Sequence, residues 1–503
     1  MPDGEAFGAL AAVDGVMHER RTQHAVARRA PTRERILYVT PEIADYVQAG
    51  GLGEVSAALP RVLRSHCDAR VLMPGYRQVV AQAVGMRVVG QLPAAHGLPS
   101  CEIGRVDAPD GLAIYLVLCP ALYDREGGPY GDASGADWPD NDLRFARLSL
   151  AAAEMACGLG DPDWRPDVLH LNDWPSALAP GYLAWRGRQV PTLLTIHNLA
   201  YQGLFPAQRL SELDIPSEAF NIDGVEFHGK ISFLKAGIYY ASHVTTVSST
   251  YAQEITRPEF GCGLDGLLRS RATEGRLTGI INGIEDDCDP KSDPSLASPF
   301  EVGDWKGKRA NADDVRTAFG LALSRGPLFA IVSRLVHQKG VDLVIEASEE
   351  LVDRGGQLVV TGRGEPRFES AMSALAKRHP GHVGVRIGFD QTEARRMYAG
   401  SDFLLMPSRF EPCGLSQMYA QRFGSLPIAH KTGGLADSIQ DGVTGFLFGD
   451  LSVAGLVGAM RRAFETFGSR RQLNAMRREA MTQSFDWFQS ASRYAALYQS
   501  VET

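Results

Sequence analysis

The sequence predicts an α/β protein of two Rossmann-like, doubly wound domains that face each other across a cleft. Short apolar runs alternate with helical patterns along most of the chain, and this alternation occurs in two series separated by a polar stretch near residues 285–308. The length of 503 residues also exceeds what one domain usually needs. Strands that alternate with helices form parallel sheets whose two faces are both covered.

The first series of apolar runs follows an arginine-rich N-terminal stretch. Its members are RILYVT from Arg35, DARVLMP from Asp68, AIYLVL from Ala113, DVLHL from Asp167, TLLTIH from Thr192 and HVTTVS from His243. We expect residues 35–283 to form an N-terminal Rossmann-like domain. We expect residues 1–34 to be a poorly ordered extension, with an organelle transit peptide as the less favoured alternative.

The second series predicts a C-terminal Rossmann-like domain over residues 284–483. Its apolar runs are PLFAIVS from Pro327, QLVVTG from Gln357, VGVRIG from Val383, DFLLMP from Asp402 and LPIAH from Leu426. Residues 484–503 then place five apolar side chains at helical spacing, namely Phe485, Phe488, Ala491, Tyr494 and Leu497. We expect this segment to be an amphipathic helix that packs back on the N-terminal domain.

Composition excludes several classes of protein. A net charge of −8 and a pI near 5.9 argue against general nucleic-acid binding. The seven cysteines form no C-x-x-C pair, and no apolar run approaches the ~18 residues of a membrane-spanning helix. The sequence therefore predicts a cytoplasmic protein in a reducing compartment, without membrane partners and without a protein-held metal or cofactor. It leaves the oligomeric state open.

Chemically capable residues follow many of the predicted strands. In open parallel sheets, ligands bind beyond the carboxyl ends of the strands. The segments at these positions are 48–54, 172–174, 197–198, 334–339, 362–364 and 409–414. Because both domains supply such groups, we expect one shared site.

A glycine-rich loop opens the first domain. Gly50, Gly51 and Gly53 suit a loop whose N–H groups approach an anion, with a helix beginning near Ser56. A plain turn is the alternative. The loop also nearly matches a dinucleotide-binding fingerprint, but it lies ten residues beyond Thr40 rather than directly after the strand.

Four further residues are candidates for catalysis. Arg334 and Lys339 are five residues apart and suit a diphosphate, although a solvated basic loop is the alternative. His197 at a strand end is by itself more often structural. Glu411 precedes an expected helix N-terminus, so its carboxylate could also serve only to cap that helix.

Longer motifs carry a family resemblance. They are GGLGEV from Gly50, LYDREGGPYGD from Leu122, TIHNLAYQGLF from Thr195, INGI from Ile281, VSRLVHQKGVD from Val332, SRFEPCGL from Ser408 and TGGLADSIQDGVTGF from Thr432. With these motifs the chain resembles the bacterial glycogen synthases and the related plant starch synthases. The resemblance implies a GT-B fold, in which residues 35–283 are the acceptor-side domain and residues 284–483 the nucleotide-sugar domain. It also implies retaining transfer of glucose from a nucleotide diphosphoglucose to the nonreducing-end 4-OH of an α-1,4-glucan.

The resemblance also implies roles for individual residues. His197, Glu411, Arg334 and Lys339 would be catalytic. The donor would be bound by Gln48, Gly50, Gly51, Asp173, Asn282, Phe389, Cys413, Gly414 and Leu415, with Phe389 stacking on the base. Glu54 and Tyr130 would lie on the acceptor or sugar side. The bacterial type of the motifs favours ADP-glucose over UDP-glucose, and the nucleotide sugar is a substrate rather than a cofactor.

Departures from the family pattern leave alternatives open. The family usually has lysine where this chain has Gln48 and aspartate where it has Glu54, and a second histidine near His170 is missing. A glucan-binding protein with reduced or no transferase activity, and a related GT-B enzyme with another donor or acceptor, therefore remain alternatives. A dehydrogenase and a glucan phosphorylase are less favoured. Lys431 is a candidate replacement for the missing cation.

Overall fold

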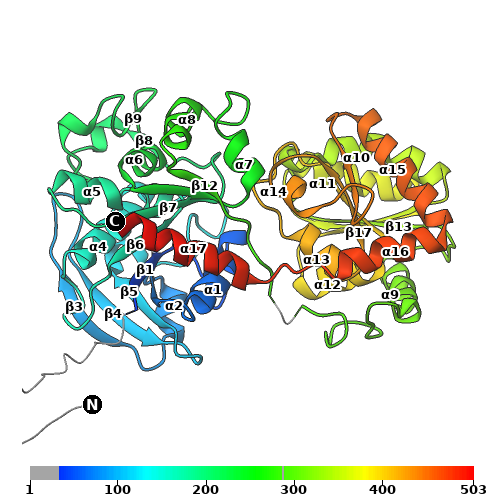
Figure 1. The fold of residues 1–503 in the computed structure, drawn as a ribbon, viewed down its shortest axis with the longest axis horizontal. Helices are drawn as coiled ribbons and strands as arrows, with labels where there is room; N and C mark the ends of the chain where they lie inside the picture. The colour runs from blue at the N-terminus through cyan, green and yellow to red at the C-terminus, as the bar shows by residue number, and fades with distance from the viewer. Residues whose placement is uncertain (1–32, 286–287, 503) are drawn as a thin grey trace, which may run out of the picture. The chain divides into compact units, whose positions relative to one another are not determined.

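The computed structural model describes residues 33–285 and 288–502. The extension predicted over residues 1–34 lies almost entirely outside the described residues. The polypeptide from Glu34 onward forms two α/β domains (Figure 1). We call them the first and second domains, and we propose residues 283/284 and 483/484 as their boundaries.

The first domain is built on a nine-stranded sheet with the order β12-β11-β7-β6-β1-β2-β5-β4-β3. Its strands are β1 (Arg35–Val39), β2 (Asp68–Pro74), β3 (Arg87–Leu92), β4 (Cys101–Asp107), β5 (Ala113–Leu118), β6 (Val168–Asn172), β7 (Thr192–Ile196), β11 (His243–Thr246) and β12 (Leu277–Gly279). The central strand β1 is parallel to both neighbours, so that Tyr38 pairs with Val71 on one side and His170 on the other. A separate three-stranded sheet contains β8 (Leu204–Pro206), β9 (Glu226–Phe227) and β10 (Lys230–Ser232).

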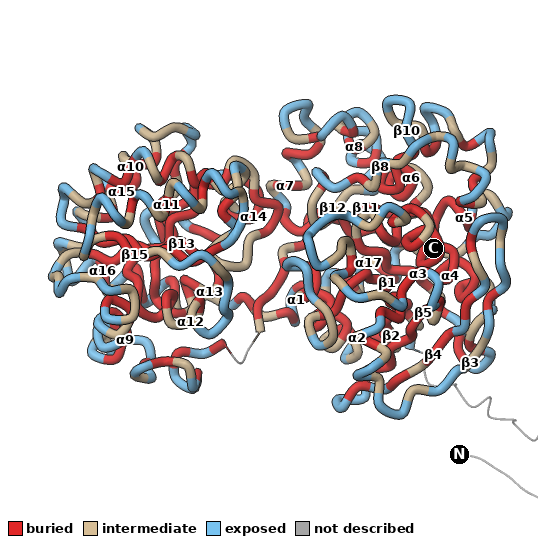
Figure 2. The backbone as a smooth tube through the Cα atoms, turned by 180° about the vertical axis from the view of Figure 1, so that it is seen from behind, coloured by how far each residue is buried: buried red, intermediate tan, exposed pale blue. Residues whose placement is uncertain are grey.

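The second domain contains a six-stranded parallel sheet with the order β15-β14-β13-β16-β17-β18. Its strands are β13 (Leu328–Val332), β14 (Gln357–Gly362), β15 (Val383–Ile387), β16 (Phe403–Met406), β17 (Leu426–His430) and β18 (Phe446–Phe448). Most strands of the two sheets are buried along most of their length (Figure 2), with β3, β12 and β15 as exceptions. Burial on two faces explains why the sequence shows continuous apolar runs here.

Helices connect and cover the strands. Those of the first half of the chain are α1 (Gly51–Leu63), α2 (Arg77–Gln82), α3 (Pro120–Tyr123), α4 (Asn141–Ala156), α5 (Ala179–Trp185), α6 (Phe233–Tyr240), α7 (Ser249–Glu254) and α8 (Asp265–Thr273). Those of the second half are α9 (Trp305–Ala318), α10 (Val341–Asp353), α11 (Pro366–Arg378), α12 (Gln391–Gly400), α13 (Ser416–Arg422), α14 (Gly433–Ser438), α15 (Val453–Gly468), α16 (Arg470–Met481) and α17 (Trp487–Glu502). In the described part of the chain, none is long and apolar enough to cross a membrane.

The C-terminal helix α17 lies against α1 and β7 of the first domain (Figure 1). Its buried face carries Ala491, Tyr494 and Tyr498. The Tyr498 hydroxyl lies 2.7 Å from His170 Nδ1, and His170 Nε2 lies 2.8 Å from Thr195 Oγ1. The end of the chain thus contributes to the interior of the domain that the beginning of the chain builds.

Three details differ from the sequence-based expectations. The first sheet is mixed, because β3 and β4 run antiparallel. Helix α1 begins at Gly51 rather than near Ser56, so the glycines form the helix N-terminus instead of a loop before it. Phe488 is 59% exposed, because the buried stripe of α17 runs through Tyr498 instead.

Candidate functional site

The carboxyl ends of β6 and β7 bring Asn172, Asp173 and His197 together. His197 Nε2 lies 2.9 Å from Asn172 Oδ1. The Asn172 amide nitrogen donates to Val39 O, so its Oδ1 faces the imidazole and must accept the Nε2 proton. Burial lowers the pKa of His197 to about 3, which keeps the ring neutral and leaves Nδ1 as a hydrogen-bond acceptor.

Asp173 has a strained backbone with φ of 53°. Its Oδ1 accepts hydrogen bonds from the N–H groups of His197 (2.7 Å) and Asn198 (3.4 Å). Burial raises the pKa of Asp173 to about 7. The carboxyl group therefore fixes the turn that carries His197, and it is close to changing charge at neutral pH.

Glu42 is a buried residue that the sequence-based reasoning missed. Its Oε2 accepts from the N–H groups of Ala49 (2.5 Å) and Gly50 (3.2 Å), and the carboxyl also hydrogen-bonds Tyr130. Burial raises the pKa of Glu42 to about 6. Glu42 thus links the glycine segment to a predicted acceptor-side tyrosine. The signal was available, since Glu42 follows β1 as closely as the polar residues chosen elsewhere follow their strands.

The glycine segment presents its backbone at the start of α1. Gly50 and Gly51 are exposed, and a Cβ built on either would meet nothing within 4 Å. A ligand can therefore approach this helix N-terminus closely. Gln48 Nε2 lies 3.2 Å from Gly50 O and 3.3 Å from Glu54 Oε1, so the Gln48 side chain lies against the first turn of α1, which carries Glu54. Burial raises the pKa of Glu54.

In the second domain, Glu411 and Lys339 form a close pair. Lys339 Nζ lies 2.5 Å from Glu411 Oε2, which also accepts a hydrogen bond of 3.0 Å from Ser408 Oγ. Glu411 is only 5% exposed. Lys339 ends a 3-10 turn, and Gly340, with φ of 67°, lets the chain turn directly into α10. A buried, oriented carboxylate beside an ammonium group results.

Arg334 joins the two domains at this point. It is exposed, and its guanidinium lies 3.4 Å from the Tyr201 hydroxyl of the first domain and 3.3 Å from Gln338 Oε1. Arg409, which also follows a strand, is instead paired at 2.6 Å with Asp342 and holds α10. Of the two arginines, Arg334 is the one whose contacts a ligand can replace.

The remaining predicted donor-binding residues differ in how far they are buried. Cys413 and Asn282 are buried, and burial raises the pKa of the Cys413 thiol to about 12, which makes it a packing residue rather than a nucleophile. Gly414 (φ 70°) and Leu415 follow in the same loop and are partly exposed. Phe389 is 68% exposed beyond β15, so its ring is available for stacking.

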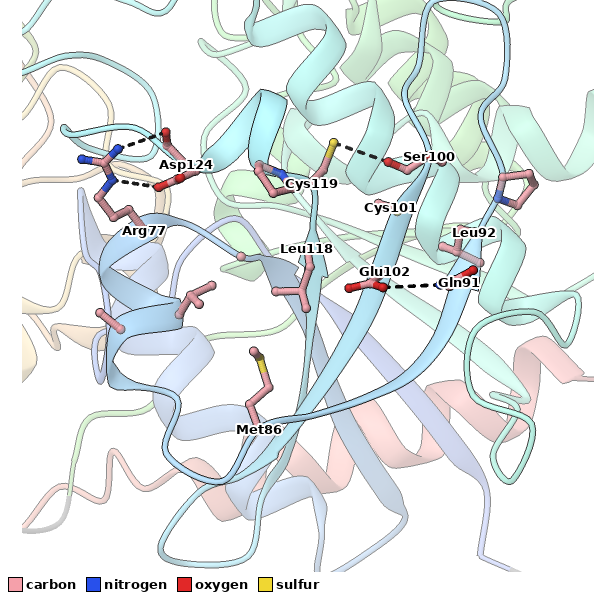
Figure 3. Close-up of a pocket in the computed structure, with 15 residues that line it drawn as sticks. Arg77, Met86, Gln91, Leu92, Ser100, Cys101, Glu102, Leu118, Cys119 and Asp124 are labelled. Carbon is pink, nitrogen blue, oxygen red and sulfur yellow. Dashed lines mark hydrogen bonds and ion pairs between the residues drawn. The ribbon is translucent and has the colours of Figure 1, made fainter.

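A pocket of about 990 Å³ lies elsewhere, beside β3, β4 and β5 (Figure 3). Its lining combines apolar side chains such as Met86 and Leu118 with a rim where Arg77 pairs with Asp124 at 2.8 Å. None of the predicted site residues lines it. Within residues 33–285 and 288–502, no group of three His, Cys, Asp or Glu side chains could hold a metal ion.

Comparisons with known proteins identify the family. Residues 35–270 match the model described as starch synthase catalytic domain, and residues 319–480 match glycosyl transferases group 1. Glycogen synthase 1 of Bradyrhizobium diazoefficiens is 59% identical over 457 residues, covering 91% of this chain and 99% of the relative. The chain belongs to the glycogen synthase and starch synthase family. Glycogen synthase of Pseudomonas fluorescens is 57% identical over 481 residues, covering 96% of this chain and 92% of the relative.

Solved structures agree with this membership of the glycogen synthase and starch synthase family. The catalytic domain of starch synthase IV from Arabidopsis thaliana, solved with ADP and acarbose, matches with a TM-score of 0.82 and 29% identity over 94% of this chain and 99% of that one. Sucrose-phosphate synthase from Thermosynechococcus elongatus matches in fold alone, with a TM-score of 0.57 and 17% identity over 93% of this chain and 99% of that one. The predicted GT-B fold and glycosyltransferase activity are confirmed, and the dehydrogenase alternative is wrong.

Proposed function

We propose that this enzyme transfers glucose from ADP-glucose to the 4-OH at the nonreducing end of an α-1,4-glucan, with retention of configuration. The observation that carries the proposal is the buried Lys339–Glu411 pair, next to Arg334, which reaches Tyr201 in the segment that follows His197. The glycogen synthases to which the chain is similar, and the ADP bound in the plant structure, support ADP-glucose over UDP-glucose.

In this proposal Arg334 and Lys339 bind the diphosphate. Negative charge grows on the leaving ADP as the glycosidic bond breaks, so two cations placed there stabilise the transition state more than the bound donor. Gly50 and Gly51 add N–H groups at the start of α1, and Gln48 adds an amide. The exposed ring of Phe389 stacks on the adenine, while Asn282, Cys413, Gly414 and Leu415 shape the donor side of the site.

Glu411 and His197 are assigned to the transferred glucose. Glu411 accepts hydrogen bonds from sugar hydroxyls or stabilises developing positive charge on the ring. His197 accepts a hydrogen bond from a sugar hydroxyl at Nδ1, the nitrogen that carries no proton because Nε2 donates to Asn172. We infer transfer on the front face, in which the departing phosphate takes the proton of the acceptor hydroxyl. Asp173, Tyr130 and Glu54 would line the sugar and acceptor side.

We also propose a cytoplasmic location. All seven cysteines are free thiols in the structure, which suits a reducing compartment.

The test is incorporation of labelled glucose into glycogen by the purified enzyme, with ADP-glucose and UDP-glucose compared side by side. Glu411→Ala should lower incorporation from ADP-glucose by at least ~100-fold, because it removes a group that acts on the developing charge. Glu346→Ala, an exposed glutamate of α10, is the matched control and should keep wild-type activity. Wild-type rates in Glu411→Ala would contradict the assignment. Glycogen binding without incorporation from either donor would favour a glucan-binding protein with impaired catalysis.

A further inference from the structure

Helices α7 and α14 cap each other across the two domains. Glu254, near the end of α7, accepts hydrogen bonds from Thr432 Oγ1 (2.9 Å) and Gly433 N (3.1 Å) at the start of α14. Asp437, near the end of α14, accepts from Ser249 N (2.6 Å) and Thr250 N (3.0 Å) at the start of α7. Each carboxylate therefore lies at the positive end of the other helix, and the two helices pack antiparallel.

The same helices hold the backbone of the loop that carries Glu411. Gly434 N donates to Glu411 O at 3.0 Å, and Ser248 Oγ donates to Pro412 O at 2.5 Å. The packing is close, since a Cβ built on Gly433 would lie 2.0 Å from Glu411 O and one built on Gly434 would lie 2.0 Å from Cys413 O. Any shift of α14 would therefore move the loop.

Burial makes the link at Glu254 stronger than that at Asp437. Glu254 is only 8% exposed, and its hydrogen bonds come from a hydroxyl and a backbone N–H. Asp437 is exposed. A buried carboxylate that accepts oriented hydrogen bonds constrains its donors, whereas an exposed one competes with water.

We propose that Glu254 of the first domain is a positioning residue for Glu411 of the second domain. It fixes Thr432 and Gly433, the next residue Gly434 fixes the Glu411 carbonyl, and Lys339 and Ser408 then orient the carboxylate. The inference rests on the proposed role of Glu411 in glucose transfer. It predicts that the acceptor-side domain sets the geometry of the donor-side carboxylate through α7 and α14.

The experiment measures glucose transfer and amide hydrogen exchange in the full-length enzyme. Glu254→Ala should lower kcat about 10- to 100-fold, because a small misplacement of a catalytic group has effects of this size, while KM for ADP-glucose changes less than about threefold. Glu254→Gln keeps an oxygen that can accept both hydrogen bonds and should recover kcat to within about threefold of wild type. Amide exchange over residues 411–415 and 432–434 should accelerate in Glu254→Ala and stay near wild type in Glu254→Gln.

Asp304→Ala is the matched control. Asp304 is an exposed carboxylate that caps the start of its own helix α9, accepting from Lys306 N (3.0 Å) and Gly307 N (3.3 Å), away from the Glu411 loop. It should alter neither kcat nor exchange over residues 411–415. Equal kcat in Glu254→Ala and wild type, or a loss of kcat with unchanged exchange in the loop, would overturn the positioning role. A wild-type enzyme that transfers no glucose would instead contradict the proposed function, and the exchange data would still test the link.

Discussion

At the residue scale, Gln48 is the departure from the family pattern with the clearest consequence. Its amide lies 3.3 Å from Glu54 Oε1, beside the exposed N-terminus of α1. Gln48→Lys would place a cation there and, through one charge-assisted contact to the diphosphate, should raise kcat/KM for ADP-glucose roughly tenfold. Initial rates over a range of ADP-glucose concentrations measure this.

Two variants control that experiment. Gln82→Lys adds the same charge at an exposed position of α2 and should leave kcat/KM unchanged. Lys431→Ala tests whether the exposed Lys431 already supplies the missing cation. No gain in Gln48→Lys, combined with a loss in Lys431→Ala, would show that Lys431 fills the site.

Glu42 gives a prediction of pH-dependent stability. Burial raises the pKa of its carboxyl from 4.5 to about 6, so the folded state binds the proton more tightly than the unfolded chain. The stability that Glu42 contributes is therefore fully present below pH 4.5 and is lost as the pH rises through 6. A glutamine at this position cannot ionise, yet its side-chain oxygen can still accept hydrogen bonds from the N–H groups of Ala49 and Gly50.

We therefore expect Glu42→Gln to become more stable relative to wild type by about 2 kcal/mol between about pH 4 and about pH 8. Urea unfolding of both proteins at the two pH values measures the difference. A difference that stays constant with pH would mean that Glu42 ionises alike in the folded and unfolded chains.

The sequence could indicate candidate site residues only where the chain is locally unusual. His197, Asp173, Arg334 and Glu411 follow strands or lie in long motifs, and the structure places His197 with Asp173 and Glu411 with Lys339. Tyr201 and Glu254 act through partners more than 100 residues away in the sequence. No local pattern specifies such contacts, because they depend on how the two domains meet.

At the element scale, prediction worked for strands buried on both faces. The apolar runs at β1, β2, β5, β6 and β7 all became strands of the first sheet, because a continuous apolar run fits a strand covered on two sides. The strands β3 and β4 were missed. Most of β3 is exposed or partly exposed and β4 alternates, since both lie toward one edge of the sheet, where one face meets solvent.

At the start of α1, tertiary hydrogen bonds override the low helix propensity of glycine. Glycine is a poor helix former, so the sequence favoured a loop up to Ser56. In the structure Glu42 accepts the N–H groups of Ala49 and Gly50, and the helix begins at Gly51. A residue nine positions upstream therefore helps to set where this helix begins.

At the scale of the whole molecule, the chain passes between the domains twice, and the two crossings contact each other. Ile284 N donates to Phe485 O at 2.8 Å, and a Cβ on Gly283 would lie 2.7 Å from Trp487 N. Beyond this point α17 returns to the first sheet, where Tyr498 closes a buried series of hydrogen bonds through His170 and Thr195. The stability of the first domain should therefore depend on the last residues of the chain.

Tyr498→Phe tests this dependence with the removal of one oxygen atom. His170 is fully buried, and burial lowers its pKa to about 3, so the neutral ring would lose its partner at Nδ1 and gain no charge in exchange. A buried polar atom left without a partner costs about 1–3 kcal/mol, and urea unfolding should show that loss in the free energy of unfolding. Phe488 lies on the same helix and is 59% exposed, so Phe488→Ala should cost less than about 1 kcal/mol. If Tyr498→Phe were as stable as wild type, α17 would lie on the first domain without stabilising it through this bond, and the link between the two ends of the chain would rest on apolar packing alone.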